Sequence, residues 1–430
     1  MTLKRMLLTL GLFFPSAIAC AEDWPQWRGS QRDGVWREDG ILDRFETRRI
    51  EAEWRVPIGP GYSGPSVAKQ RVFITDRQLE PQPSERVLCF DSKTGQRLWE
   101  HRYPCEYTIS YTAGPRANVT VEDNRAFSLG AMGQFCCLDA GTGDVLWQRD
   151  LNRDYQIRMP IWGIAAAPLV FDDLVIVHIG AADGASLVAF EKKSGDEEWR
   201  ALNDRAQYSA PVLVHQAGHE VLACWTGDSV AGMSPRKAEV YWRMPFAPQK
   251  MPIGIATPIV QDDLLFVTSF YDGSLLLRLS QERLGIEKVW QRVGRSEQET
   301  DALQSIISTP LFQGKYIYGV DSYGELRCLD AATGDRLWED KTATPPARWS
   351  NIHFVKHEDK IWMFNERGEL IISRLSPQGF EEISRAKLIE PTLEQLRRRD
   401  GVCWAHPAFA DRHVFVRNDK ELICASLEAD

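Results

Sequence analysis

The sequence predicts an all-β protein, an eight-bladed β-propeller built from four-stranded antiparallel blades. Three observations support this: a recurring hairpin, eight strand-opening motifs, and a last repeat that lacks one strand. The hairpin is clearest in four copies: LDAATGDRLW (329–338), LDAGTGDVLW (138–147), FDSKTGQRLW (90–99) and FEKKSGDEEW (190–199). Glycine at the turn allows a positive φ, and a hairpin that recurs about every 50 residues is typical of propellers and solenoids.

The first residues have the pattern of an export signal. Residues 1–21 contain Lys4 and Arg5, an apolar run, and the small residues of Ala17-Ile18-Ala19, as secretory signal peptides do. Cys20 follows directly, like the modified cysteine of bacterial lipoproteins, so a lipoprotein signal with a lipid anchor at Cys20 is an open alternative. No later stretch is apolar and long enough for a transmembrane segment. We therefore expect an exported, periplasmic protein.

Two further segments complete the predicted organisation. Residues 22–48 form an aromatic lead-in that begins with WPQWRG, and residues 49–430 form a single eight-bladed propeller domain. The net charge of −9 gives no electrostatic basis for binding nucleic acid. The protein is expected to be a monomer.

The repeats can be followed from one blade to the next. Each opens with a small residue, usually followed by proline, and then an apolar strand. The openings are Gly64-Pro65, Gly114-Pro115, Ala167-Pro168, Ala210-Pro211, Thr257-Pro258, Thr309-Pro310, Ile352-His353 and His406-Pro407. Each repeat ends on a strand with a marker residue: Trp54, Trp99, Trp147, Trp199, Trp242, Trp290, Trp338 and, in the eighth place, Ile383.

The two chain ends are expected to share the last blade. Residues 405–427 have room for three strands, whereas residues 51–58 carry Trp54 in the marker position without a preceding hairpin strand. Pairing residues 51–58 with residues 421–427 would close the ring and leave no long sheet edge exposed. An insertion at residues 389–402 has a capping-box pattern and a terminal glycine, which predict a short surface helix before this blade.

The nine cysteines favour packing over disulfides at several positions. Alignment on the marker tryptophans places small residues at one site: Cys89, Cys137, Cys328, Cys424 and Ala189. Cysteine behaves there as a small hydrophobic residue. The adjacent Cys136 and Cys137 are expected to point to opposite faces of a strand, with a vicinal disulfide as the alternative. The pairing of Cys105, Cys224 and Cys403 stays open.

These repeats resemble the quinoprotein-type propeller repeats of bacterial PQQ-dependent dehydrogenases and their non-enzymatic relatives. The shared blade signature stands here as Cys328, Asp330, Thr333-Gly334 and Trp338, and the lead-in resembles exported PQQ-like repeat proteins. The resemblance implies that the marker tryptophans pack between adjacent blades. It also implies a fold related to the propeller lipoprotein of the outer-membrane β-barrel assembly machine.

No catalytic or metal-binding motif is found in the sequence. It contains no GxSxG, HExxH or glycine-rich phosphate loop, and its histidines are scattered. No residue can be matched to the calcium ligands, catalytic aspartate or quinone contacts of a quinoprotein dehydrogenase. We therefore expect no cofactor, with PQQ and Ca²⁺ as the alternative.

The strongest candidate site is the channel mouth, where the loops before the innermost strands meet. The candidate residues there are Tyr62, Tyr111, Arg116, Trp162, Tyr208, Arg348, Trp349, Trp404 and His406. Their rings can plug and pack the channel, or they can form a binding site for a ligand or partner. We predict a non-catalytic scaffold that binds a protein, small-molecule or glycan partner at one face of the ring. The alternative is a PQQ-dependent oxidoreductase of the alcohol or sugar dehydrogenase type.

Overall fold

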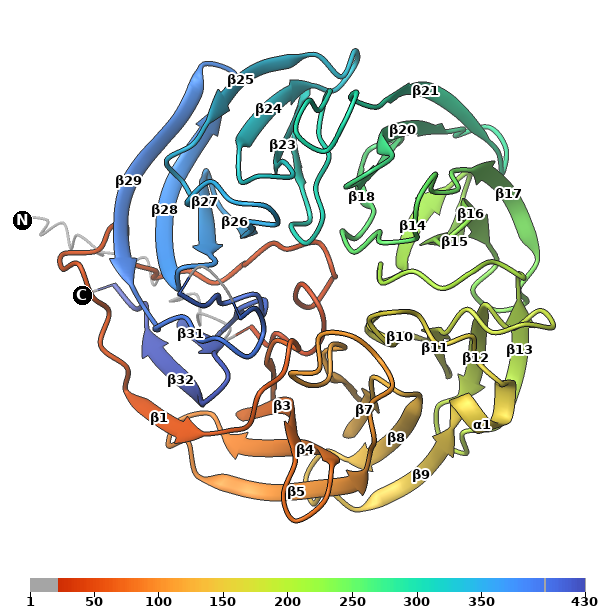
Figure 1. Ribbon diagram of the computed structural model, residues 1–430, viewed down its shortest axis with the longest axis vertical. Coiled ribbons are helices and arrows are strands. Elements are labelled where there is room, and N and C mark those ends of the chain that lie inside the picture. Colours follow the sequence, from red (N-terminus) through yellow and green to blue (C-terminus); the bar gives the residue numbers. More distant parts are fainter. Residues whose placement is uncertain (1–21, 398–399, 430) are drawn as a thin grey trace, which may run out of the picture.

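In a computed structural model, which describes residues 22–397 and 400–429, the chain forms eight four-stranded antiparallel sheets around a central channel (Figure 1). This confirms the predicted all-β, eight-bladed propeller. The predicted signal segment, with Cys20, lies outside the described residues. Within them, no helix is long and apolar enough to cross a membrane.

The strands of each blade follow one another in the chain from the channel outward, except in the last blade. The first four blades are β2 (Ser66–Ala68), β3 (Arg71–Gln78), β4 (Ser84–Asp91), β5 (Arg97–Pro104); β6 (Thr120–Glu122), β7 (Arg125–Leu129), β8 (Gln134–Asp139), β9 (Val145–Asp150); β10 (Leu169–Phe171), β11 (Leu174–His178), β12 (Leu187–Glu191), β13 (Glu197–Ala201); and β14 (Val212–Gln216), β15 (His219–Trp225), β16 (Ser229–Met233), β17 (Val240–Pro245). The next three are β18 (Ile259–Gln261), β19 (Leu264–Ser269), β20 (Gly273–Leu279), β21 (Ile286–Arg292); β22 (Leu311–Gln313), β23 (Tyr316–Val320), β24 (Leu326–Asp330), β25 (Arg336–Asp340); and β26 (Ile352–His357), β27 (Lys360–Asn365), β28 (Glu369–Ser376), β29 (Gly379–Lys387).

The last blade joins the two ends of the chain, as predicted. It consists of β30 (Ala408–Ala410), β31 (His413–Arg417), β32 (Glu421–Ser426) and, as its outermost strand, β1 (Trp54–Pro57) from the N-terminal side (Figure 1). Strands β1 and β32 are antiparallel, with Trp54 opposite Cys424. The backbone groups of both strands are thereby paired, and the ring has no open edge at the seam.

The marker tryptophans connect neighbouring blades. The indole N–H of Trp99 donates a hydrogen bond to the backbone oxygen of Ala140 in the next blade, and Trp147 does the same to Lys192. The turn glycine of the next hairpin lies against the ring: a Cβ on Gly143 would come within 2.7 Å of Trp99, and its φ is +79°. The repeated Thr-Gly turn is therefore required both for the turn conformation and for close packing on the preceding blade.

The small site that recurs opposite these tryptophans is buried, and the described cysteines form no disulfides. Cys136 packs in the interface with the preceding blade, whereas Cys137 packs in the interface with the following one. The two adjacent side chains thus point to opposite faces of β8, as expected. Burial raises the pKa of both thiols to about 12.

The lead-in segment crosses the channel instead of lying on the outside of the ring. Trp24 forms a β-bridge with Val67 in β2, and the Trp27 indole donates to the hydroxyl of Thr257, 2.8 Å away in another blade. The guanidinium of Arg32 donates to backbone oxygens just before β10. The segment is visible as the red loop in the centre of the ring (Figure 1).

The helix predicted in the insertion at residues 389–402 is absent from the described part of that segment, so this prediction was wrong. The hydroxyl of Thr392 does not cap a helix; it donates to the Asp419 carboxylate. The Gln395 side chain donates to Gly61 and accepts from the Trp404 backbone N–H. These bonds hold the insertion as a loop over the channel. The α-helix found among the described residues, α1 (Leu151–Tyr155), connects the second and third blades.

Candidate binding site at the channel mouth

A cavity of about 150 Å³ lies at the channel mouth, bounded by the loops that precede the innermost strands. Eight of the nine predicted site residues line it: Tyr62, Tyr111, Arg116, Trp162, Tyr208, Trp349, Trp404 and His406. Arg348 is not among the lining residues and lies behind the cavity wall. The sequence thus predicted which side chains gather here, because each lies in the loop just before an innermost strand.

The wall of the cavity is a continuous cluster of aromatic rings. Trp162 is at its centre, with ring centroids 5.1 Å from Tyr208, 5.9 Å from Tyr111 and 6.1 Å from Trp349. The hydroxyl of Tyr208 also accepts a hydrogen bond from the Trp162 backbone N–H. The rings come from four different blades, so their packing fixes the relative positions of loops far apart in sequence.

Two arginines stabilise this wall from different sides. The guanidinium of Arg116 lies 4.9 Å from the Tyr62 ring centroid and donates to the Ser110 backbone oxygen. The guanidinium of Arg348 lies 4.5 Å from the Trp349 ring centroid and forms a 2.8 Å ion pair with Glu297. The hydrogen bond from Arg348 lowers the pKa of Glu297, which therefore stays ionised.

The floor of the cavity contains two buried histidines beside the lead-in. The rings of His353 and His406 are 4.8 Å apart, and His406 also packs edge-on against Trp27. Nε2 of His353 lies 2.8 Å from the Trp404 backbone oxygen, and Nδ1 of His406 lies 2.6 Å from that of Pro407. Since a carbonyl can only accept, these nitrogens carry the protons.

The floor is consequently neutral and rich in acceptors at physiological pH. Burial, together with the nearby Arg28, lowers the pKa of His353 to about 4 and that of His406 well below its usual value. Nδ1 of His353 and Nε2 of His406 are then lone-pair acceptors, and neither has a hydrogen-bond partner among the described residues. The site can therefore hold an apolar or aromatic group that carries a hydrogen-bond donor at its tip.

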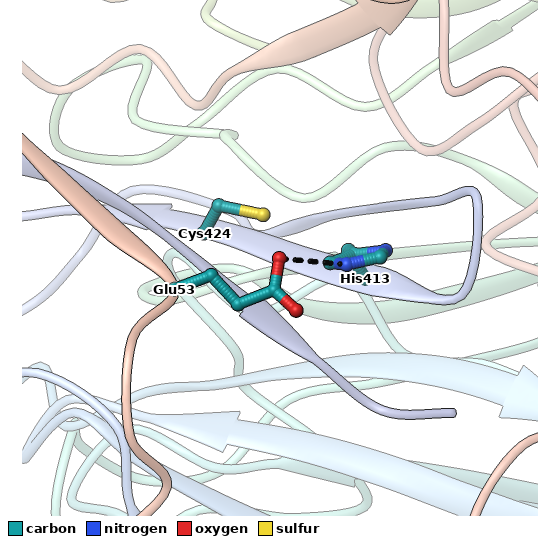
Figure 2. A group of neighbouring side chains, drawn as sticks. All are labelled: Glu53, His413 and Cys424. Atoms are coloured by element: carbon teal, nitrogen blue, oxygen red, sulfur yellow. Dashed lines mark hydrogen bonds and ion pairs between the residues drawn. The ribbon is translucent and has the colours of Figure 1, made fainter. Parts of the chain in front are cut away.

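The cavity does not fit PQQ with Ca²⁺. None of its lining residues is an aspartate or glutamate, whereas Ca²⁺ takes six to eight oxygen ligands, carboxylates prominent among them. Among the described residues, a group of metal-ligand side chains lies instead at the ring seam, formed by Glu53, His413 and Cys424 (Figure 2).

Sequence reasoning missed four polar or aromatic lining residues: Trp27, Asn118, Thr257 and His353. His353 could have been found, because it occupies a strand opening in the same way as His406. Trp27 could not, since nothing in the repeat indicates that the lead-in enters the channel.

Comparisons with known proteins agree with this architecture. The family model described as outer membrane protein assembly factor BamB matches residues 83–340 and 227–428. The curated protein of that name from Shewanella oneidensis is 22% identical over 322 residues, covering 69% of this chain and 73% of the relative. The one from Burkholderia pseudomallei is 21% identical over 67% of this chain, which spans only 59% of that relative's length.

Solved structures show the same fold at lower identity. The crystal structure of BamB from Moraxella catarrhalis has a TM-score of 0.58 at 14% identity, covering 87% of this chain and 99% of that one. Quinohemoprotein alcohol dehydrogenase from Comamonas testosteroni has a TM-score of 0.60 at 11% identity, covering 95% and 81%. Both likenesses concern the fold alone.

Proposed function

The chain belongs to the family described as outer membrane protein assembly factor BamB, and we propose that it is an exported, non-catalytic scaffold in outer-membrane protein assembly. In this proposal the scaffold binds a protein partner at the channel mouth. Family membership supports a role in outer-membrane protein assembly, and the geometry of the channel mouth supports partner binding there.

The observation that carries the proposal is that all eight blades contribute a large apolar or aromatic side chain to one cavity. These side chains are Tyr62, Tyr111, Trp162, Tyr208, Ile255, Ile306, Trp349 and Trp404. Tryptophan, tyrosine and arginine are the residues most enriched at the energetic centres of protein interfaces. A ring of them around a preformed hollow suits the anchoring of one partner side chain.

The rigidity of the site adds to its suitability. Trp162 is held by Tyr111, Tyr208 and Trp349, so little side-chain freedom remains to be lost when a partner binds. The neutral histidines of the floor would accept a hydrogen bond from the tip of the inserted side chain. A partner tyrosine or tryptophan offers this combination of a flat ring and a terminal donor.

Photo-cross-linking in the native host tests this proposal. A photoreactive amino acid at Tyr111 should cross-link to another protein of outer-membrane assembly, whereas the same group at Leu146, exposed on an outer strand, should not. Trp162→Ala should weaken the cross-link and lower the abundance of outer-membrane β-barrel proteins. Leu337→Ala, also exposed on an outer strand, is the matched control. Unchanged cross-links and abundance in Trp162→Ala would contradict the proposal.

Two other ligand classes give distinct outcomes. A glycan at the aromatic mouth would change tryptophan fluorescence when the purified protein meets a glycan panel. PQQ would remain bound after incubation with Ca²⁺ and desalting, and would reduce a dye with alcohols or sugars. Either result at stoichiometric occupancy would replace the protein partner as the occupant of this site.

The proposal also covers the location, lipid attachment and oligomeric state of the mature protein. We propose a periplasmic monomer whose Cys20 carries a lipid anchor. Mass spectrometry of the mature N-terminus distinguishes a lipidated Cys20 from a simple cleavage product, and sedimentation measures the oligomeric state.

A further inference from the structure

The seam of the ring gathers three metal-ligand side chains from the two ends of the chain. Glu53 directly precedes β1, His413 begins β31, and Cys424 lies in β32 (Figure 2). A carboxylate oxygen, a ring nitrogen and the sulfur lie within 4.8 Å of one another. We propose that Glu53, His413 and Cys424 bind a divalent metal ion of the zinc class across this seam.

The orientation of His413 favours a cation in this position. Its Nδ1 faces the backbone oxygen of Asp411, so Nδ1 carries a proton and donates it. Its Nε2 faces the Glu53 carboxylate at 3.1 Å. With Nδ1 donating, this contact is attractive when a positive charge stands between Nε2 and the carboxylate, either a second ring proton in an ion pair or a metal ion. A carbonyl partner on the other nitrogen is the usual support of a metal-bound histidine.

The ligand set and spacing suit zinc. Zn²⁺ binds cysteine, histidine and carboxylate at about 2.0–2.3 Å in tetrahedral geometry, which puts ligand atoms about 3.3–3.6 Å apart. The 3.1 Å between the Glu53 carboxylate and Nε2 of His413 is close to this, and the Cys424 sulfur lies within 4.8 Å of both groups. Glu53 is exposed, so the fourth position opens to water.

The electrostatic surroundings agree with a cation site. The Cys424 sulfur lies near the negative carboxylates of Glu53 and Asp411. A bound divalent ion would be attracted by both carboxylates and would displace the thiol proton as it binds the sulfur.

The other blades show that packing alone does not require these residues. At the position of Cys424 they carry Cys89, Cys137 and Cys328, which are equally buried. At the position of His413 those three blades have Arg71, Arg125 and Tyr316, and at that of Glu53 they have Leu98, Leu146 and Leu337. Histidine and glutamate therefore flank the cysteine in the blade that joins the two chain ends and in none of these three. A metal there would link β1 to β31 and β32 and hold the ring closed.

The replacement residues for the test can be taken from the equivalent positions of other blades, where they are already accommodated. His413→Arg and Glu53→Leu copy other blades, and Cys424→Ala copies Ala189. Titration of the purified mature protein with Zn²⁺ should show one saturable site and a rise in Tm. Co²⁺ in its place should give a thiolate-to-metal absorption band.

Each variant should lower Zn²⁺ affinity by more than about 100-fold, since even outer-shell changes cost 10–100-fold. It should also abolish the cobalt band and the rise in Tm. Cys89→Ala, the matched control, should change neither. Absence of saturable binding, or binding that persists in His413→Arg and Glu53→Leu, would overturn the proposal.

Discussion

Trp147 and Trp162 show how differently the same side chain is used in two regions of this propeller. Trp147 belongs to the repeat: it packs between blades and donates to the next one. Trp162 lies outside the repeated hairpin, in the loop before β10, and it packs in the ring around the mouth cavity. The blade interfaces hold the fold and are replicated around the ring, whereas the mouth is assembled once, from one loop of every blade. Changes to the two regions should therefore separate stability from binding.

The largest loss of stability is expected when β1, the strand that closes the ring, is removed. A chain that begins at residue 61 lacks both the lead-in and β1, so β32 would expose an unpaired edge. We expect loss of cooperative unfolding and aggregation, measured by calorimetry and light scattering against a chain that begins at residue 22. A chain that begins at residue 49 keeps β1 but loses the buried Trp24, Trp36 and Ile41, so it should still fold, with a lower free energy of unfolding. If all three chains unfold alike, ring closure does not depend on β1.

The next largest effect is expected within a single blade interface. Trp147→Ala removes a large side chain that is 9% exposed together with its hydrogen bond to Lys192. The free energy of unfolding should fall by about 3–5 kcal/mol, as for other buried aromatic truncations. Urea unfolding measures this loss, with Leu146→Ala on the exposed side of the same strand as the control. A loss below about 1 kcal/mol would be inconsistent with the packing between blades.

The channel floor should make stability depend on pH. The pKa of buried His353 is lowered to about 4, whereas an unfolded histidine titrates near 6.5. As pH falls through that interval, the unfolded chain binds protons first, so stability that is complete above about pH 6.5 is lost progressively toward pH 4. Each such histidine contributes about 1.4 kcal/mol per pH unit. Buried His178 in β11, with a pKa also lowered to about 4, adds to the same slope.

Urea unfolding between pH 7.5 and pH 5 measures this slope. His353→Gln should make the dependence of stability on pH shallower by the contribution of one histidine, about 1.4 kcal/mol per pH unit. His215→Gln, at an exposed position, should leave it unchanged. An identical slope in wild type and His353→Gln would show that folding does not shift the pKa of His353.

The contrast between repeat and mouth also explains what could be predicted from sequence. The marker tryptophans, the small site at Cys89 and its equivalents, and the closing strand all follow from a pattern repeated several times, and the structure confirms them. The mouth residues were found because each lies just before an innermost strand. Trp27 was missed because it enters the channel from outside the repeat.

Features that depend on a single tertiary contact could not be read from the pattern. Thr392 and Gln395 have the spacing of a helix cap, but their side chains bond instead to Asp419, Gly61 and Trp404. The seam group is equally hidden, because Glu53 and His413 are far apart in sequence and neither belongs to a metal-binding motif.

The smallest effect on stability is expected behind the cavity wall, and it tests most directly whether mouth and blades are separable. Arg348 lies over the Trp349 ring and pairs with Glu297, but its side chain remains 30% exposed. Arg348→Ala should therefore cost no more than about 1 kcal/mol of stability. It should nevertheless weaken cross-linking from Tyr111, because Trp349 loses the group that fixes its ring. Arg295→Ala, which removes a 91% exposed side chain, should affect neither property. A loss of stability without any change in cross-linking would place Arg348 with the blade interfaces and not with the mouth.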